Sequence, residues 1–187
     1  MRKLVYCVAS TIDGYIAAPD AGDPTSFWPM SPEYLQHMVE ETPEILPGQA
    51  RAAMGITGDG KQFDTVVEGR GSYEVGLRAG IQDAYPHLRH YVFSRTLHSE
   101  HVEVVATDPV EKVRELKRET GKDIWLVGGA TLAGALYGEI DRLIVKLGPL
   151  TIGDGIPFLR HGFEQVNWRL AHHDAAGDAL FLTYDRA

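Results

Sequence analysis

The chain has 187 residues, of which 44% are hydrophobic and 24% charged, and these values are typical of a folded domain rather than a disordered chain. The net charge of -8 argues against partners such as nucleic acid or an anionic membrane surface, and no apolar run approaches the roughly 18 residues of a membrane helix. The single cysteine, Cys7, excludes an intramolecular disulfide, so we expect a cytoplasmic protein. Residues 1–187 are expected to form one domain.

The N-terminal part predicts one strand, one helix and a segment without clear periodicity. The apolar run at 4–9 predicts a strand that is buried on both faces. After a polar loop, Ser31-Pro32-Glu33 predicts a helix N-terminus with Ser31 as its cap, and the helix should end before Pro43. Residues 43–62 hold several glycines and predict no regular element.

The middle of the chain alternates strands and helices. One helix is predicted to start at Tyr73, and a second at Asp108-Pro109, with Asp108 as its N-cap and Gly121 as its stop. A short third helix should follow Gly128-Gly129. The strands of this part are predicted at 64–67, 90–93, 102–105 and 124–127.

The C-terminal part predicts strands alone. They are expected at 142–147, 164–171 and 179–184, with a hairpin turn at 175–178. Strand–helix alternation followed by strands alone predicts a three-layer α/β/α fold, in which a mainly parallel mixed sheet carries antiparallel C-terminal strands.

Two strand–glycine–helix junctions are the main candidate binding sites. The first is Gly69-Arg70-Gly71-Ser72, and the second is Val127-Gly128-Gly129-Ala130-Thr131-Leu132. Glycine lets the backbone approach a ligand closely, and the free N–H groups at a helix start favour an anion such as a pyrophosphate. As a pair they could hold a dinucleotide from two sides, whereas each alone could simply allow tight helix–strand packing.

The pair Ser94-Arg95 follows the strand at 90–93 and is the candidate for cofactor selectivity. A hydroxyl and a guanidinium at a strand end suit the phosphate on the adenosine ribose of NADPH, where an acidic residue would suit NAD. Arg70 could assist. The alternative is a solvated surface arginine.

Two nucleotide-binding motifs are near matches that fail. The Rossmann fingerprint lacks its third glycine, since Glu74 stands at that position. The segment 55–62 has the glycine and lysine spacing of a P-loop, but Gln62 replaces the Ser or Thr that would hold magnesium. No His, Cys or acidic cluster has the spacing of metal ligands, so we expect no metal site.

Six segments follow one another in the order of a known family: 8–17, 69–74, 92–95, 126–130, 140–143 and 148–158. They resemble the dihydrofolate reductase superfamily, most closely its branch with the C-terminal reductase domain of the riboflavin biosynthesis protein RibD. The resemblance implies that Ala9 and Ile16 belong to a first strand and loop over the nicotinamide. It also implies that the two glycine turns hold the pyrophosphate and that Asp13 and Gly153 contact the substrate.

The segment Trp28-Pro29-Met30-Ser31-Pro32-Glu33 resembles the part of folate-type reductases that carries an acidic substrate-binding residue. The resemblance implies a catalytic role for Glu33, whose carboxylate would anchor the ring and help to protonate it. Hydride delivery to a C=N bond needs a proton on nitrogen, which a carboxyl group can supply. The alternative is a first-turn acidic residue that the helix dipole favours.

These expectations combine into an NADPH-dependent reductase that acts on a small-molecule heterocyclic substrate and forms a homodimer. The leading substrate is a phosphoribosylamino-uracil pyrimidine of riboflavin biosynthesis, for which Arg160 and Lys146 are candidate phosphate donors. A dihydrofolate or pterin reductase is the first alternative. The others are a module that binds a nucleotide or flavin without turnover, and a dimeric structural protein.

Overall fold

The computed structural model describes residues 1–20 and 28–187. Its helices are α1 (Pro32–Glu41), α2 (Gly48–Ala53), α3 (Arg70–Arg78), α4 (Pro109–Arg118) and α5 (Ala130–Ala135), with 3-10 turns at Pro43–Ile45 and Tyr137–Glu139. Its strands are β1 (Leu4–Ser10), β2 (Tyr15–Ala17), β3 (Phe63–Gly69), β4 (Arg89–Phe93), β5 (Glu103–Val105), β6 (Asp123–Gly128), β7 (Arg142–Leu147), β8 (Ile156–Pro157), β9 (Trp168–Ala176) and β10 (Ala179–Arg186). Within the described ranges, no helix has the length and apolar character needed to cross a membrane.

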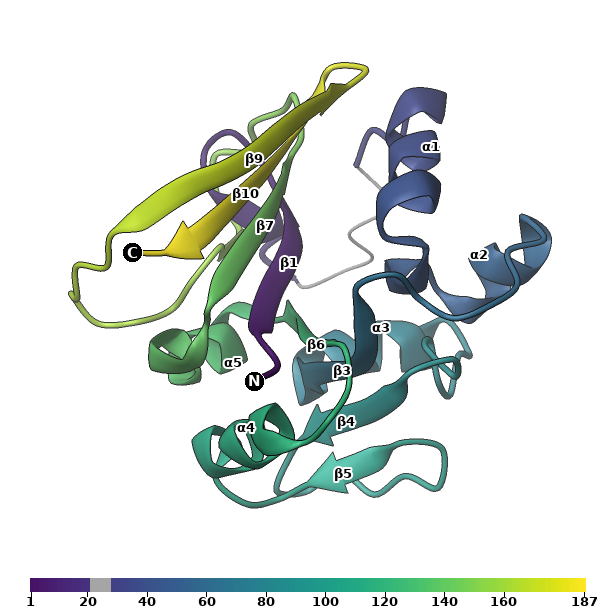
Figure 1. Cartoon of the computed structure of the whole chain (residues 1–187), viewed down its shortest axis with the longest axis vertical. Helices are drawn as coiled ribbons and strands as arrows, with labels where there is room; N and C mark the ends of the chain where they lie inside the picture. Colours follow the sequence, from purple (N-terminus) through teal and green to yellow (C-terminus); the bar gives the residue numbers. More distant parts are fainter. Residues whose placement is uncertain (21–27) are drawn as a thin grey trace.

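The main sheet has eight strands in the order β5-β4-β3-β6-β1-β7-β10-β9 (Figure 1). The strands from β5 to β7 are parallel, and β10 pairs antiparallel with both β7 and β9. The predicted mixed sheet with antiparallel C-terminal strands is therefore confirmed. Because parallel strands end at one edge of the sheet, the turns after β1, β3, β4 and β6 lie along the same side, where such folds bind their ligands.

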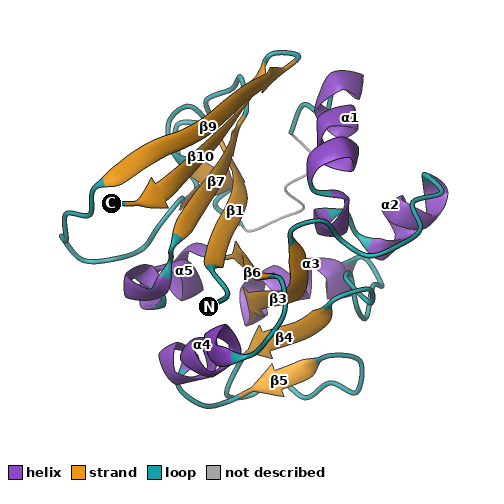
Figure 2. Cartoon of the chain, in the orientation of Figure 1, coloured by secondary structure: helices purple, strands orange, loops and turns teal. Residues whose placement is uncertain are grey.

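Helices cover both faces of the sheet, as Figure 2 shows. On one face, Leu116 of α4 packs with Tyr6 of β1 in a layer of buried hydrophobic side chains. On the other face, Tyr34 of α1 packs in a second layer with Cys7 of β1 and Trp125 of β6. Successive side chains of a strand point to opposite faces, so β1 supplies both layers and must be apolar throughout. The three-layer α/β/α fold is confirmed.

The start of α3 differs from the prediction. The helix begins at Arg70 rather than at Tyr73, so the predicted turn at 69–72 already forms its first turn. Arg70 and Glu74 pair one helical turn apart, with Nε and Oε1 at 2.6 Å. A pair at this spacing supports a first turn that contains glycine.

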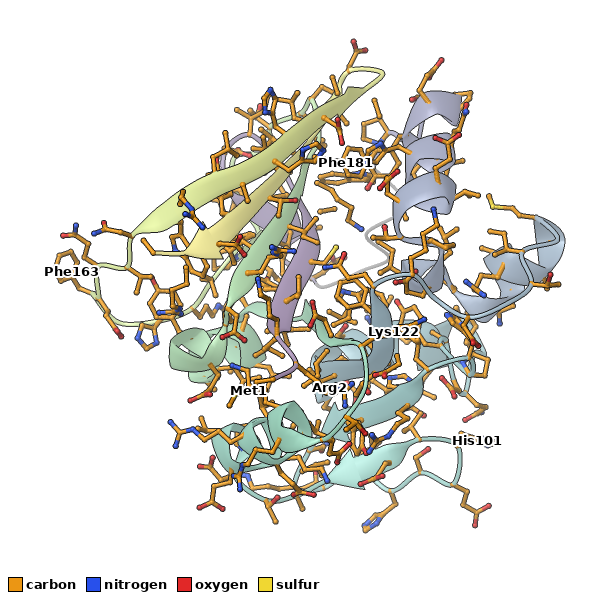
Figure 3. The ribbon with its side chains drawn as sticks, viewed as in Figure 1. Met1, Arg2, His101, Lys122, Phe163 and Phe181 are labelled. Atoms are coloured by element: carbon orange, nitrogen blue, oxygen red, sulfur yellow. The ribbon has the colours of Figure 1, made fainter. Side chains whose placement is uncertain are left out.

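The start of β9 also differs from the prediction. The strand begins at Trp168, because Trp168 pairs with Arg186 at the end of β10 and residues 164–167 have no partner strand. It continues to Ala176, which narrows the hairpin turn to two residues. Figure 3 shows the two ends of this region: Phe163 points away from the molecule in the loop before β9, and Phe181 points from β10 toward α1.

The sequence predicted no regular element in residues 43–62, which is wrong, because the 3-10 turn at Pro43–Ile45 and α2 lie there. The segment folds around the carboxylate of Glu44. Glu44 is fully buried and accepts hydrogen bonds from the backbone N–H groups of Lys61 at 3.1 Å, Gln62 at 2.6 Å and Phe63 at 2.7 Å. Three consecutive N–H groups form the kind of nest that can bind an anion. Here the anion is a side chain of the same protein, which agrees with the argument against a P-loop.

Arg51 is the second buried charge of this segment. Its guanidinium donates hydrogen bonds to the carbonyl oxygens of Pro43 and Gly58, both at 2.8 Å. The Pro43 carbonyl also accepts from the Leu46 N–H within the 3-10 turn, and Gly58 lies in the loop after α2, so Arg51 ties these two parts of the segment together. The segment is thus held by buried charges, which hydrophobic periodicity does not detect.

Candidate functional site

The two glycine junctions lie side by side, because β3 and β6 are neighbouring parallel strands. A Cβ atom placed on Gly69 would lie 3.7 Å from the carbonyl oxygen of Gly128 and 3.9 Å from the backbone nitrogen of Gly129. α3 follows the first junction and α5 the second. The structure therefore brings together the two segments that the sequence singled out as a pair.

Open space adjoins both turns. A Cβ atom on Gly71 or on Gly129 would meet no atom within 4 Å. Gly128 differs, since its φ of 125° is one that other residues rarely adopt, and its peptide bond to Gly129 is cis. A ligand could therefore approach the backbone at Gly71 and Gly129 without displacing a side chain.

The other predicted cofactor residues of the junctions fall into two groups. Ser72 and Thr131 lie in the first turns of α3 and α5 and keep part of their surface exposed. Ala130 and Leu132 are buried, and Val127 packs against the core. The second group can offer a ligand only backbone atoms.

Arg70, Ser94 and Arg95 gather at the ends of β3 and β4. The Arg70 Nη1 atom donates to the Thr96 hydroxyl at 2.7 Å. The Ser94 hydroxyl accepts hydrogen bonds from the N–H groups of Thr96 at 3.3 Å and Leu97 at 3.0 Å, which fixes the turn after β4. Arg95 is exposed, and no hydrogen bond or ion pair engages its guanidinium within residues 1–20 and 28–187.

A cavity of about 550 Å³ lies next to this turn. It is lined by residues of α3, including Tyr73, and by the segment between β4 and β5, including Leu97 and His98. Its volume is within the range of roughly 300–1,000 Å³ that is common for small-molecule sites. No sequence pattern marks this cavity, since it is formed by two segments with no shared motif.

A buried charged network, which was not predicted from the sequence either, supports the end of β3. The Nε2 atom of His90 lies 2.8 Å from Glu68 Oε1, and its Nδ1 atom lies 2.7 Å from Asp83 Oδ1. Burial lowers the pKa of His90, but its hydrogen bonds to the two carboxylates outweigh burial and raise it above its ordinary value. Glu68 directly precedes Gly69, so this network fixes the backbone at the first junction. An acidic residue inside an apolar strand was the available signal.

Asp13 ties the loop after β1 to the turn after β7. Its carboxylate accepts hydrogen bonds from the Thr11 hydroxyl at 2.5 Å and from the N–H groups of Ile152 at 3.0 Å and Gly153 at 2.7 Å. These bonds, the one from Thr11 first, hold the pKa of the Asp13 carboxyl below its usual value. The two predicted substrate residues, Asp13 and Gly153, are therefore hydrogen-bonded to each other.

The first loop also carries the residues predicted to lie near a nicotinamide. Ala9, near the end of β1, packs against the core layer under α1. Ile16 lies on β2, which pairs antiparallel with β8 in a small second sheet that the sequence did not predict. Both residues are partly buried. Across the described residues, no group of three or more His, Cys, Asp or Glu side chains is placed to hold a metal ion.

Glu33 lies in the first turn of α1 and is exposed. Hydrogen bonds from its own backbone N–H and from the Ser31 hydroxyl lower the pKa of its carboxyl. A Cβ atom on Gly177, in the β9–β10 turn, would lie 3.5 Å from Glu33 Oε2, so the carboxylate lies close to the hairpin. An exposed carboxylate with a lowered pKa suits a helix N-terminus and is ionised at neutral pH, which favours the capping alternative.

The sheet order and the helices on both of its faces define a dihydrofolate reductase-like α/β domain. A riboflavin biosynthesis protein from Shewanella sp. PV-4 has the same fold, with a TM-score of 0.70 and 18% identity over 100% of this chain and 99% of that chain. Dihydrofolate reductase from Enterococcus faecalis, complexed with NADP(H) and RAB-propyl, has a TM-score of 0.67 and 17% identity over 98% of this chain and 96% of that chain.

The chain belongs to the RibD C-terminal domain family, whose model matches residues 2–182. It is 29% identical to the uncharacterized protein YwjB of Bacillus subtilis, over 100% of this chain and 99% of that protein. It is 32% identical to the riboflavin biosynthesis protein RibD of Haemophilus influenzae, over 38% of this chain and 23% of that protein. The resemblance that the motifs indicated is therefore confirmed.

Proposed function

We propose that this protein is an NADPH-dependent reductase of a small heterocyclic substrate. The observation that carries the proposal is the pair of adjacent glycine turns, with open space at Gly71 and Gly129. Backbone N–H groups at such turns suit a pyrophosphate. Ser94 suits a ribose phosphate together with Arg95, whose guanidinium has no partner among the described residues. The bound cofactor would supply the hydride, and the protein would orient the two rings.

The family supports a pyrimidine of riboflavin biosynthesis as the leading substrate. A dihydrofolate or pterin is the second candidate, which the fold supports and the exposed position of Glu33 weakens. Oxidation of NADPH in the presence of pyrimidines, pterins and flavins tests these candidates directly. Tight NADPH binding without oxidation by any of them would favour a binding module that does not turn over.

Arg95→Ala should weaken NADPH binding by about 10- to 150-fold and NADH binding far less, since a charge-assisted hydrogen bond contributes about 1.5–3 kcal/mol. Titration of both cofactors into the wild type and the variant measures this difference. Arg118→Ala, which changes an exposed arginine of α4, is the matched control and should bind both as the wild type does. Equal losses for NADPH and NADH would contradict the assignment.

Glu33→Gln should leave turnover and its pH profile nearly unchanged and slightly lower the melting temperature. The reason is that the Glu33 carboxyl is exposed and its lowered pKa keeps it ionised, so it is a poor proton donor at neutral pH. Steady-state rates across the pH range measure this. A roughly 10²- to 10⁴-fold loss of turnover, typical of a missing acid–base group, would instead support the catalytic role that the resemblance implies.

We also propose that the protein is a homodimer. β9 is the last strand of the sheet, and its outer edge pairs with no strand in the described part of the chain. Leu170 on this strand is 49% exposed. A second copy could cover such an edge, which otherwise invites aggregation. Light scattering at micromolar concentration should give the mass of a dimer, and a monomer mass would reject this proposal.

A further inference from the structure

Lys146 is the next-to-last residue of β7, which lies between β1 and β10. Its register partners are Ala9 on β1 and Phe181 on β10. Residues paired across neighbouring strands share a face of the sheet, and both partners belong to the core layer beneath α1. Figure 3 shows Phe181 pointing toward α1. The Lys146 side chain is therefore directed into the same layer.

In the part of the chain that the structure describes, the ammonium of Lys146 has no counter-charge in this layer. Within residues 1–20 and 28–187 no hydrogen bond or ion pair engages it, and its titratable neighbours are Tyr34 and Cys7. Burial, the largest influence, lowers the pKa of Lys146, while coulombic interactions with Tyr34 and Cys7 raise it, and the net direction is upward. By contrast, the buried Lys117 has Asp141 as its partner, with Nζ and Oδ2 at 2.7 Å. A partly buried charge without a partner costs stability, and a bound anionic ligand would offset that cost.

The surroundings of Lys146 indicate where such a ligand would lie. Ala9, its neighbour on β1, belongs to the first strand and loop that the family resemblance implies to lie over the nicotinamide. The rings of Tyr34 and Phe181 pack together in the same layer, with centroids 5.1 Å apart. A flat ring that receives a hydride at this position would have aromatic surface and one cation beside it.

We propose that the Lys146 ammonium binds an anionic oxygen carried on the ring of the substrate. This inference rests on the proposed reductase function and adds the substrate class to it: an acidic heterocycle, such as a ring carboxylate or a deprotonated imide. An ammonium attracts such a ring and repels a protonated diamino heterocycle, which needs a carboxylate partner. The exposed position of Glu33 agrees with this choice.

The test compares three probes on the NADPH-loaded full chain. Orotate carries a carboxylate on a pyrimidine ring, 2,4-diaminopyrimidine carries a protonatable amidine, and ribose 5-phosphate carries an anion without such a ring. Calorimetric titration should show orotate as the tightest of the three. Lys146→Met should weaken the binding of orotate by about 10- to 150-fold, the range of one charge-assisted hydrogen bond. Lys146→Arg should keep part of the affinity for orotate.

A second readout needs no ligand. Lys146→Met keeps most of the side-chain volume and removes the unpaired charge, so its melting temperature should rise by about 2–4 °C, as a stabilisation of about 1 kcal/mol would give. Lys117→Met is the matched control, because it breaks the pair with Asp141. It should lower the melting temperature and leave orotate affinity unchanged.

The outcomes separate this inference from the function on which it rests. Equal orotate affinity in wild type and Lys146→Met, or a preference for 2,4-diaminopyrimidine, would overturn the role of Lys146 and leave NADPH binding intact. Tighter binding of ribose 5-phosphate than of orotate would overturn the ring-borne anion. If the wild type does not bind NADPH, the proposed reductase fails, and the same titrations without cofactor still decide whether Lys146 binds the anion.

Discussion

Gly129→Val should abolish NADPH binding and leave the protein folded. The backbone of Gly129 has φ -79° and ψ -167°, an extended conformation that valine adopts readily. A Cβ atom there meets no protein atom within 4 Å, so the added methyl groups would occupy the space that the proposed pyrophosphate needs. Loss of two charge-assisted hydrogen bonds, at about 1.5–3 kcal/mol each, corresponds to a loss in affinity of more than about 100-fold.

The control for this variant is Gly162→Val. Gly162 is exposed in the loop before β9 and also has open space around its Cβ position. The Gly162→Val protein should bind NADPH as the wild type does. Both variants should retain the circular dichroism spectrum and melting temperature of a folded protein. Gly128 is unsuitable for this purpose, because its φ of 125° would strain any other residue. Normal NADPH affinity in a folded Gly129→Val protein would reduce the second turn to a packing feature.

The fold was predictable because its strong signals are local. The first strand is apolar at nearly every position, as a strand covered on both faces must be, and the structure buries it between two helical layers. The N-cap of α4 was equally predictable, and the structure shows the Asp108 carboxylate accepting hydrogen bonds from the N–H groups of Val110 at 2.8 Å and Glu111 at 3.1 Å. The start of β9 was not predictable, because it depends on where β10 ends and not on the residues of β9 itself.

The candidate site was predictable where glycine marks it. The junctions at Gly69 and Gly129 could be paired from the sequence because parallel neighbouring strands end at one edge. The buried network that supports the first junction could not be predicted, since Glu68, Asp83 and His90 come from separate segments and show no common pattern. Lys146 shows the same limit. The sequence made it only a candidate phosphate donor, whereas its place next to Ala9, without an ion-pair partner in residues 1–20 and 28–187, is visible only in the folded sheet.

Glu44→Ala should cause a large loss of stability, although Glu44 touches none of the residues predicted to bind cofactor or substrate. The fully buried carboxylate satisfies three backbone N–H groups, at 61, 62 and 63. A buried N–H left without a partner costs about 1–3 kcal/mol, and here the Phe63 N–H is buried while the bonds of Lys61 and Gln62 are partly buried. The variant should therefore lose about 3 kcal/mol of the 5–15 kcal/mol typical of a domain. At about 2–4 °C per kcal/mol, its melting temperature should fall by roughly 6–12 °C.

Two further variants test the cause of that loss. In Glu44→Gln the amide oxygen can still accept from Gln62 and Phe63 at the Oε1 position, while the amide nitrogen faces the Lys61 N–H and loses that bond. Its melting temperature should therefore lie between those of wild type and Glu44→Ala. Glu41→Ala, an exposed residue at the end of α1, should melt as the wild type does. If Glu44→Ala melts like Glu41→Ala, water replaces the carboxylate at no cost, and the segment 43–62 is held by Arg51 and apolar packing instead.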